Sequence, residues 1–399
     1  MKAGWQTKTL GEICTIKGGK RVPKGYKLKT EPTPHPYISV SDFTEDGTVS
    51  KAKMKYVDPD IFEQIKRYTI TSNDLYLSIA GTIGKTGFVP PELSGASLTE
   101  NACKLVLGPE VDKEFLYHVT RSGIFSEHVE NNTRTAAQPK LSLERLKTIP
   151  IPLPPLEEQQ RIVAVLDEAF EGLARARAHA EANLQNAREL FETSLSAFID
   201  RHKDSWSSTT LGEAYDVRDG THDSPKYHAT GRALITSKNL GRDGLHFEKV
   251  KYISEEDYVS ISRRSGVDKG DVLFAMIGTI GNPIVVDVEP NFAIKNVALF
   301  KMKEGRSGQF LRYVLRSKYV VEKMHAEAKG TTQQFVGLGH LRSFPVILPD
   351  PIVESTMVDE LDRIEAQCRS AEALYEINIQ DLDDLRQSLL QKAFAGELT

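Results

Sequence analysis

The stretch PPLEEQQRIVAVLDEAFEGLARARAHAEANLQNARELFETSLSAFIDR, residues 154–201, decides the fold of this chain. Its apolar and small residues recur at alternating steps of four and three, which keeps them on one face of a helix. Pro154 and Pro155 end the preceding segment, and Glu157 and Glu158 follow where the helix dipole favours acidic groups. The pattern predicts one long helix with a coiled-coil seam formed by Ile162, Leu166, Ala169, Leu173, Ala176, Ala180, Asn183, Ala187 and Leu190.

A second seam with the same stepping lies at the other end of the chain. It follows another proline-rich approach, FPVILPDP, residues 344–351. A helix with a single apolar stripe needs a partner to cover it, so we expect the two helices to pair as an antiparallel coiled coil. Two unrelated core helices in separate domains are the alternative, but helices this long and regular are rare there. The second seam consists of Met357, Leu361, Ile364, Cys368, Ala371, Tyr375, Asn378, Leu382, Leu385 and Leu389.

Additional apolar residues lie beside both seams, among them Phe170, Phe191, Leu195, Leu374 and Leu390. Two helices alone cannot cover all of these side chains, so their number predicts that another protein packs on the helical pair.

Length and composition limit the class of protein. A chain of 399 residues suggests two or more domains. Its apolar runs are too short for a membrane span, and MKAGWQTKTL at the start is not followed by an apolar segment, so we expect a cytoplasmic protein. Cys14, Cys103 and Cys368 are scattered and odd in number, which predicts reduced, buried thiols rather than disulfides or a zinc site.

The net charge of −4 is unevenly distributed along the chain. Residues 1–150 carry 21 Lys and Arg against 17 Asp and Glu, and residues 206–349 carry 20 against 16. The segments 151–205 and 350–399 are acidic, with 6 basic against 10 acidic residues and 4 against 12. Two mildly basic domains separated by acidic helices fit a protein whose globular parts approach phosphate.

An internal repeat of about 195 to 200 residues organises the rest of the chain. WQTKTLGEIC at Trp5 returns as WSSTTLGEAY at Trp206, and FLYHVTRSGIFSEHV at Phe115 returns as FLRYVLRSKYVVEKM at Phe310. Each globular copy mixes short strand-like runs with helical segments in no regular alternation, which indicates an α+β domain. The expected order is a globular domain at 1–153, a central helix at 154–203, a second globular domain at 204–349 and a C-terminal helix at 350–399.

The repeated segment GTIG resembles the end of a phosphate-binding loop but does not fit one. Ile79 stands where the loop requires its first glycine, and the second copy has Asn282 in place of Lys85. A tight turn between strands is the simpler interpretation. The chain also has no HExxH motif, and no adenine-methyltransferase signature of Asn or Asp followed by two prolines and an aromatic residue. We therefore predict no catalytic residues and no cofactor in this chain.

Polar, small and basic residues gather in loops at equivalent places of the two copies. KGGKRVPKGYK and NNTRTAAQPK in the first copy correspond to VRDGTHDSPKYH and AKGTTQQF in the second. Arg, Lys, Asn and Gln read base edges in DNA, whereas a solvated turn remains the alternative for any single loop. The predicted DNA-binding residues are Lys17, Lys20, Arg21, Lys24, Lys85, Asn131, Asn132, Arg134, Gln138, Lys140, Arg218, Thr221, His222, Lys226, Lys329, Thr331, Thr332, Gln333 and Gln334.

Taken together, the chain resembles the specificity subunits of type I restriction-modification systems. The resemblance rests on the W…TLGE openings, the GTIG turns, TAAQPKLSLERLKTIPIPLPPLEEQQRIV from Thr135 and the ending LRQSLLQKAFAGEL from Leu385. These motifs cover nearly the whole chain. The second copy departs from the pattern, because PIVESTMV replaces PLEEQQRI, so contacts of Glu157 to Arg161 do not carry over to it.

The resemblance implies two target recognition domains, each reading half of a bipartite, asymmetric site in double-stranded DNA. It also implies that the helices dock two methyltransferase subunits, with restriction subunits of the helicase-nuclease type completing the assembly. Those partners would use S-adenosylmethionine, ATP and magnesium, and this chain would be non-catalytic. Two other classes stay open at this point: an adaptor that only scaffolds proteins without specific DNA binding, and an enzyme with an unrecognised active site.

Overall fold

The computed structural model covers residues 1–399, and the structure describes all of them except residues 1, 3, 134–139, 279, 329–334 and 399. The chain divides into two compact units. The first unit comprises Met1–Ala180 together with Ile377–Thr399, and the second comprises Glu181–Glu376. Among the described residues, no helix is both long and apolar enough to cross a membrane.

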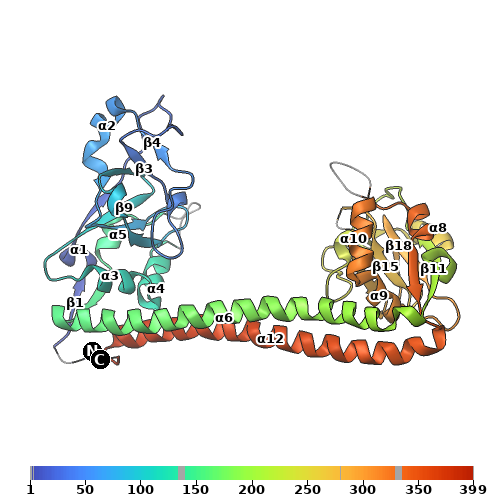
Figure 1. The fold of residues 1–399 in the computed structure, drawn as a ribbon. Helices are drawn as coiled ribbons and strands as arrows, with labels where there is room; N and C mark the ends of the chain where they lie inside the picture. Colours follow the sequence, from blue (N-terminus) through green and yellow to red (C-terminus); the bar gives the residue numbers. More distant parts are fainter. Residues whose placement is uncertain (1, 3, 134–139, 279, 329–334, 399) are drawn as a thin grey trace. The chain divides into compact units, whose positions relative to one another are not determined.

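Three sheets form the framework of the first unit (Figure 1). An antiparallel four-stranded sheet has the order β2-β9-β6-β7, with bounds Cys14–Gly18, Ala102–Leu107, Leu75–Ser78 and Thr86–Phe88. A mixed sheet has the order β4-β3-β8-β5, with bounds Lys55–Tyr56, Pro36–Ile38, Ala96–Leu98 and Thr69–Ile70. The third sheet pairs β1 (Gln6–Thr9) with β10 (Pro150–Leu153).

Short helices connect these strands, and several begin at a capping side chain. Asp112 accepts a hydrogen bond from the backbone N–H of Phe115, and Ser122 does the same for Phe125, so each satisfies a donor that the first helical turn leaves unpaired. The helices are α1 (Leu10–Ile13), α2 (Pro59–Ile65), α3 (Lys113–Thr120), α4 (Gly123–Asn131) and α5 (Leu143–Lys147). Single turns of 3₁₀ helix lie at Val40–Asp42, Lys66–Tyr68 and Pro91–Leu93.

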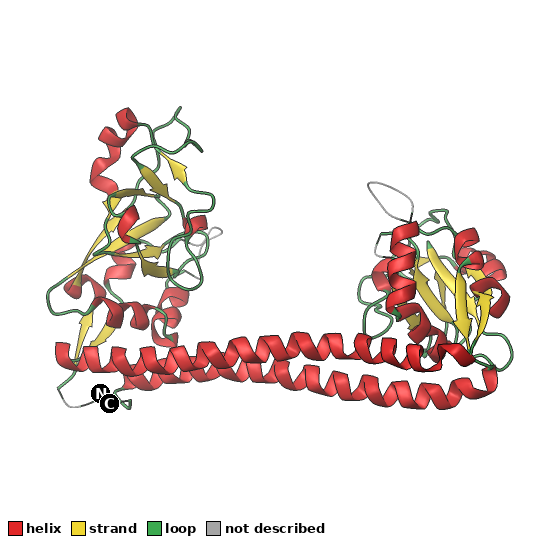
Figure 2. Ribbon diagram, viewed as in Figure 1, coloured by secondary structure: helices red, strands yellow, loops and turns green. Residues whose placement is uncertain are grey.

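The second unit repeats this architecture, except that its mixed sheet has three strands where that of the first unit has four (Figure 2). Its four-stranded sheet is β12-β18-β15-β16, with bounds Asp216–Asp219, Val297–Lys301, Val272–Ala275 and Gly281–Val285. The other sheets are β14-β13-β17 (Lys251–Ile253, Arg232–Ile235 and Phe292–Ile294) and β11-β19 (Ser207–Thr210 and Pro345–Leu348). The helices are α7 (Leu211–Ala214), α8 (Glu255–Ser265), α9 (Gly308–Arg316), α10 (Lys318–Glu327) and α11 (Leu338–Ser343), with 3₁₀ turns at Lys203–Ser205 and Ser237–Asn239.

Matching strand orders confirm the predicted α+β tandem repeat. The pairs β3·β8 and β13·β17 are the parallel ones in the two mixed sheets, while β2·β9 and β12·β18 are antiparallel in both copies. From β6 to β10, a residue of the first unit corresponds to the residue roughly 195 positions later, as for Phe115 and Phe310, which begin the same helical segment. The two copies can therefore be compared position by position.

Two long helices run through both units, α6 (Leu156–His202) and α12 (Pro351–Ala395). In the first unit the beginning of α6 shares a core with the end of α12, through Ile162 and Leu166 on one helix and Leu390 and Phe394 on the other. In the second unit the end of α6 shares a core with the beginning of α12, where Leu195 and Leu361 belong to the same cluster. The helices therefore pair antiparallel within each unit, as predicted.

The predicted seam is wrong at several positions. Leu190 is 53% exposed and Leu385 is 49% exposed, and Ala176 and Asn183 are exposed as well. Phe191 is buried in place of Leu190. The periodicity identified one apolar stripe, but near Leu190 helix α6 also packs against the core of a globular domain, and there Phe191 is the buried residue.

The apolar residues beside the seams are covered by the chain itself. Phe170, Phe191, Leu195 and Leu390 are buried in cores that join the helices to the neighbouring globular domain. Leu374 differs, because it is 55% exposed. Two helices alone do not cover these side chains, as expected, but the chain's own globular domains bury most of them, so they do not by themselves indicate a second protein. The three cysteines are buried and free, as expected, and burial raises the pKa of the Cys14 and Cys103 thiols to about 12.

Candidate nucleic-acid interface

The first candidate loop follows β2 and carries Lys20, Arg21 and Lys24 on its exposed side. Lys17 lies within β2 and is also exposed. The Arg21 Nε donates to Glu100 Oε1 at 2.5 Å, and the hydroxyl of Tyr37 donates to the backbone oxygen of Lys20 at 3.0 Å. These contacts hold the loop against the mixed sheet and leave Lys20 and Lys24 facing solvent.

A glycine fixes the base of this loop. A Cβ on Gly19 would lie 2.1 Å from the backbone oxygen of Thr99, so only glycine permits this close approach. Gly220 occupies the corresponding place in the second unit, where a Cβ would lie 2.4 Å from the backbone oxygen of Ile294. The two loops therefore leave their sheets in the same way.

The GTIG segment forms a turn between β6 and β7. Gly81 and Gly84 have positive φ angles of 77° and 93°, and the backbone N–H of Lys85 donates to the Ser78 hydroxyl at 2.8 Å. The ammonium of Lys85 forms an ion pair with Glu45. The interpretation as a turn between strands is confirmed, and Lys85 is held at its end beside a carboxylate.

Asn131 and Asn132 end helix α4. The side-chain amide of Asn132 donates to the His128 backbone oxygen at 2.8 Å, and Arg145 donates to the Asn132 backbone oxygen at 2.6 Å. Asn132 thus terminates a helix in this structure. Lys140 is exposed and pairs through its backbone with Ala80.

The equivalent loop of the second unit follows β12. The guanidinium of Arg218 donates to Asp216 at 2.6 and 2.9 Å, and these hydrogen bonds raise the pKa of Arg218 and lower that of Asp216. The ring nitrogens of His222 lie 2.8 Å from Asn296 Oδ1 and 2.8 Å from Asp219 Oδ2. Thr221 is held by its backbone, and its hydroxyl accepts from a backbone N–H, while Lys226 is exposed.

The structure brings several predicted residues of each unit to one loop after the first strand of the large sheet. The side chains of other predicted residues form local hydrogen bonds instead: Arg218 pairs with Asp216, and Asn132 caps the end of α4. The remaining predicted residues lie outside the described part of the chain: Arg134, Gln138, Lys329, Thr331, Thr332, Gln333 and Gln334. DNA contact by the predicted residues stays a prediction.

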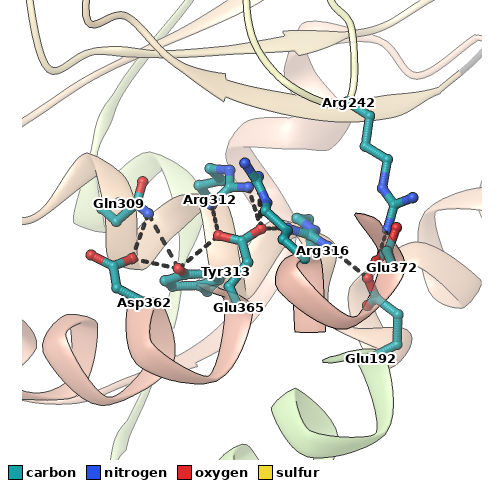
Figure 3. Close-up of polar contacts among 10 residues, drawn as sticks. Glu192, Arg242, Gln309, Arg312, Tyr313, Arg316, Asp362, Glu365 and Glu372 are labelled. Atoms are coloured by element: carbon teal, nitrogen blue, oxygen red, sulfur yellow. Dashed lines mark hydrogen bonds and ion pairs between the residues drawn. The ribbon is translucent and has the colours of Figure 1, made fainter. Parts of the chain in front are cut away.

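A network of charges joins the second globular domain to the helices, and sequence analysis missed it (Figure 3). Glu365 on α12 accepts hydrogen bonds from Arg312 at 2.7 and 2.8 Å and from Arg316 at 2.5 Å, both on α9. Arg369 and the Tyr313 hydroxyl reach the same carboxylate at 3.1 and 3.0 Å. Arg312 and Glu365 are only 7% and 8% exposed, so this is a buried, bidentate ion pair.

The electrostatics of Glu365 follow from this geometry. Burial alone would raise the pKa of its carboxyl, but the hydrogen bonds and charges of Arg312 and Arg316 hold that pKa well below its usual range. Around it, Asp362 accepts from Tyr313 at 2.5 Å and from Gln309 at 2.7 Å. Contacts at the margin complete the network, with Arg316 donating to Glu192 at 2.9 Å and Arg242 to Glu372 at 2.9 Å (Figure 3).

The first unit has the same junction with different side chains. His118 and Asp167 occupy the positions equivalent to Tyr313 and Asp362, and His118 Nε2 lies 3.1 Å from Asp167 Oδ1. Phe170 stands where the second unit has Glu365, and its ring meets the His118 ring edge-on at 5.5 Å. Burial lowers the pKa of His118, although the Asp167 carboxylate acts in the opposite direction.

A second contact recurs at the start of each long helix. Gln159 on α6 accepts from the backbone N–H of Asp112 at 2.8 Å, and Glu354 on α12 accepts from the backbone N–H of Ser307 at 2.6 Å. Asp112 and Ser307 are the capping residues of α3 and α9. Each domain is therefore bound to a long helix through the capping residue of its own short helix, α3 in the first unit and α9 in the second.

The amino-acid sequence of this chain is similar to those of known proteins. A family model described as the type I restriction modification DNA specificity domain matches residues 2–179. The chain is 22% identical over 387 residues to the MjaVIII specificity subunit of Methanocaldococcus jannaschii, covering 90% of this chain and 86% of that one. It is 24% identical over 361 residues to the EcoBI specificity subunit of Escherichia coli, covering 83% and 75%.

Solved structures share the whole fold. A chain from a study of complex assembly and conformational transition of a type I restriction-modification system matches with a TM-score of 0.76, 20% identity, and coverage of 100% of this chain and 99% of that chain. The HsdS subunit of Thermoanaerobacter tengcongensis matches with a TM-score of 0.60, 19% identity, and coverage of 100% and 98%. Residues 2–179 thus match the type I restriction modification DNA specificity domain, and over nearly its whole length the chain is similar to specificity subunits of type I restriction-modification systems.

The residues that sequence analysis missed are those that join each globular domain to the long helices. Glu365 and Arg312 carry no motif, because an ion pair between residues 53 positions apart is visible only once the fold is known. The pair His118 and Asp167 could have been suggested by the repeat, since aligning the copies places it opposite Tyr313 and Asp362.

Proposed function

We propose that this specificity subunit recognises a bipartite, asymmetric site in double-stranded DNA, with one half-site read by each recognition domain. The observation that carries the proposal is that two domains with one backbone fold present different side chains on equivalent loops. Lys20 and Arg21 in the first unit correspond to Thr221 and His222 in the second. Because direct readout depends on side-chain donors and acceptors, loops with different side chains select different bases.

The paired helices are the part of the chain that docks its protein partners. The partners in this proposal are two methyltransferase subunits and the restriction subunits, which supply adenine methylation with S-adenosylmethionine and cleavage driven by ATP and magnesium. The specificity subunit contributes recognition and holds the assembly together, and it performs no chemistry of its own. Leu374, which is 55% exposed on α12, is an apolar position available to a partner.

Methylome sequencing tests the proposal directly. The specificity subunit is expressed with its methyltransferase subunit in a host without other adenine methylation, and modified positions are mapped across the genome. The expected result is one interrupted motif with two different halves. A continuous or palindromic motif would refute the two-domain reading, and modification that does not depend on this chain would refute DNA recognition by it.

A second variant assigns the half-sites to the domains. Replacing residues 204–349 by the corresponding domain of another family member should change one half of the motif and leave the other half intact. If both halves change together, the domains do not read separately.

A further inference from the structure

Two exposed tyrosines occupy the same loop in the two units, and neither is among the residues predicted to bind DNA. Tyr26 is 53% exposed and Tyr227 is 40% exposed. Each follows a lysine on the loop that leaves the first strand of the four-stranded sheet, as PKGY at residues 23–26 and PKY at residues 225–227. A single exposed aromatic side chain needs no explanation, but its recurrence at an equivalent place in both copies does.

The loop of the first unit is fixed at both ends while its tip is free of the core. At the base, Gly19 N–H donates to the Ala102 oxygen at 2.9 Å, and Lys20 N–H donates to the Leu98 oxygen at 2.8 Å. At the far end, Lys29 and Tyr56 exchange backbone hydrogen bonds at 2.9 and 3.0 Å. Tyr26 lies on the tip between these anchors.

The loop of the second unit has matching anchors. Gly220 N–H donates to the Val297 oxygen at 2.9 Å, and Thr221 N–H donates to the Ile294 oxygen at 3.0 Å. His228 N–H donates to the Tyr252 oxygen at 2.9 Å and closes the loop directly after Tyr227. Both tyrosines are therefore presented on loops whose ends are held by a sheet, which limits the conformational entropy that binding would cost.

Both rings are exposed to solvent, and that of Tyr227 lies beside a positive charge. Gly25 has a φ angle of 98°, and the N–H of Tyr26 donates to the Pro23 oxygen at 3.2 Å, so a tight turn displays the ring. In the second unit the Lys251 ammonium lies 4.1 Å from the centre of the Tyr227 ring. An aromatic ring next to an ammonium group suits duplex DNA, because the ring can pack against deoxyribose while the cation meets phosphate.

We propose that Tyr26 and Tyr227 are paired positioning residues that pack their rings against duplex DNA, one at each half-site. The inference rests on the proposed function of the two domains. The ring, not the hydroxyl, makes the contact, because its apolar face packs against deoxyribose, which is the same at every base pair. The two tyrosines consequently strengthen binding to all duplexes and leave the choice of sequence to the neighbouring side chains.

The experiment compares single substitutions in the full chain assembled with its methyltransferase subunit. Fluorescence anisotropy at constant salt measures the Kd for a duplex carrying the motif found by methylome sequencing and for a duplex of random sequence. Tyr26→Ala and Tyr227→Ala should each weaken binding to both duplexes by roughly 5- to 30-fold, the effect of losing a partly buried aromatic side chain. Tyr26→Phe and Tyr227→Phe should stay within about twofold of the parent, because they keep the ring.

Tyr319→Ala is the matched control, since Tyr319 is 54% exposed but lies on helix α10. It should bind both duplexes as the parent does. The inference is overturned if the alanine variants at Tyr26 and Tyr227 also bind as the parent does, or if the phenylalanine variants lose as much affinity as the alanine variants. In either case the proposed function is judged separately, and it stands if the unsubstituted parent binds the duplex with its motif more tightly than the random duplex. A parent without that preference overturns both.

Discussion

Replacing Glu365 by glutamine should loosen the second recognition domain from the helices. The substitution keeps the shape of the side chain but removes the charge that faces Arg312, and Arg312 is only 7% exposed. Breaking a buried ion pair by removing one partner costs about 3 to 5 kcal/mol, because the remaining charge is buried without compensation. Arg316 retains Glu192 at 2.9 Å, so we expect the lower end, about 3 kcal/mol.

Hydrogen exchange measured by mass spectrometry on the intact complex follows this effect locally. A loss of about 3 kcal/mol corresponds to roughly 100-fold faster opening, and the amides of α9 should show it. Amides of α3 in the first unit should exchange as in the parent, because their junction contains His118 and Asp167 instead. The matched control is Glu376→Gln, which removes an exposed ion pair with Arg188 and should change exchange by less than about fivefold.

The reasoning fails if the amides of α9 exchange no faster in Glu365→Gln than in Glu376→Gln. A double substitution sharpens the test, since Arg312→Leu combined with Glu365→Leu removes both charges at once. Its cost should be smaller than that of Glu365→Gln, because no buried charge is left alone. A double variant that is less stable than the single one would show that the network acts through packing and not through charge.

Three further predictions follow from other parts of the molecule. Burial lowers the pKa of His118 below its unfolded value near 6.5, so folding favours the neutral imidazole. The stability of the first unit should therefore fall as the pH drops below about 6.5. Thermal unfolding between about pH 7.5 and 5.5 measures this dependence, and His118→Tyr should remove it. Gly19→Ala should displace the loop after β2 and weaken DNA binding, because the alanine Cβ would lie 2.1 Å from the backbone oxygen of Thr99. Gly123→Ala is the control. A Cβ at Gly123 would meet nothing within 4 Å, so this variant should bind DNA with the Kd of the parent. Inserting four residues after Ala180, chosen to continue the apolar seam, adds about 6 Å of helix. Methylome sequencing should then show a spacer between the half-sites that is longer by roughly one to two base pairs. An unchanged spacer would mean that the helices do not set its length.

The sequence predicted the framework because the framework depends on repeated local signals. Seam periodicity located both long helices, and the recurring WxxxTLGE and GTIG segments correctly indicated two copies of one domain, which share their strand order. The error at Leu190 shows the limit of periodicity. A helix that packs against both a partner helix and a domain buries more than one stripe, and the four-three pattern cannot say which residues serve the second contact.

The candidate site was harder to predict because its side chains have two competing uses. Asn132 and Arg218 have the donors that read bases, and the structure engages them in a helix terminus and an ion pair. Residue type alone does not distinguish these uses, since the same hydrogen-bonding groups serve both. The junction residues show the converse, because Glu365 was indistinguishable from a solvated helical glutamate until its three arginine partners were brought together by the fold.

Comparison of the two copies separates general from specific contacts in a way that neither copy allows alone. Positions at which the copies agree, such as Gly19 with Gly220 and Tyr26 with Tyr227, are expected to serve what both loops have in common, which is to leave the sheet in the same way and, under the proposed function, to meet a duplex. Positions at which they differ, such as Arg21 and His222, stand on the same backbone with different hydrogen-bonding groups. Because a shared backbone places equivalent side chains alike, two domains that read DNA would differ in the bases they select at such positions, and under the proposed function we expect sequence choice at the divergent positions of the loops.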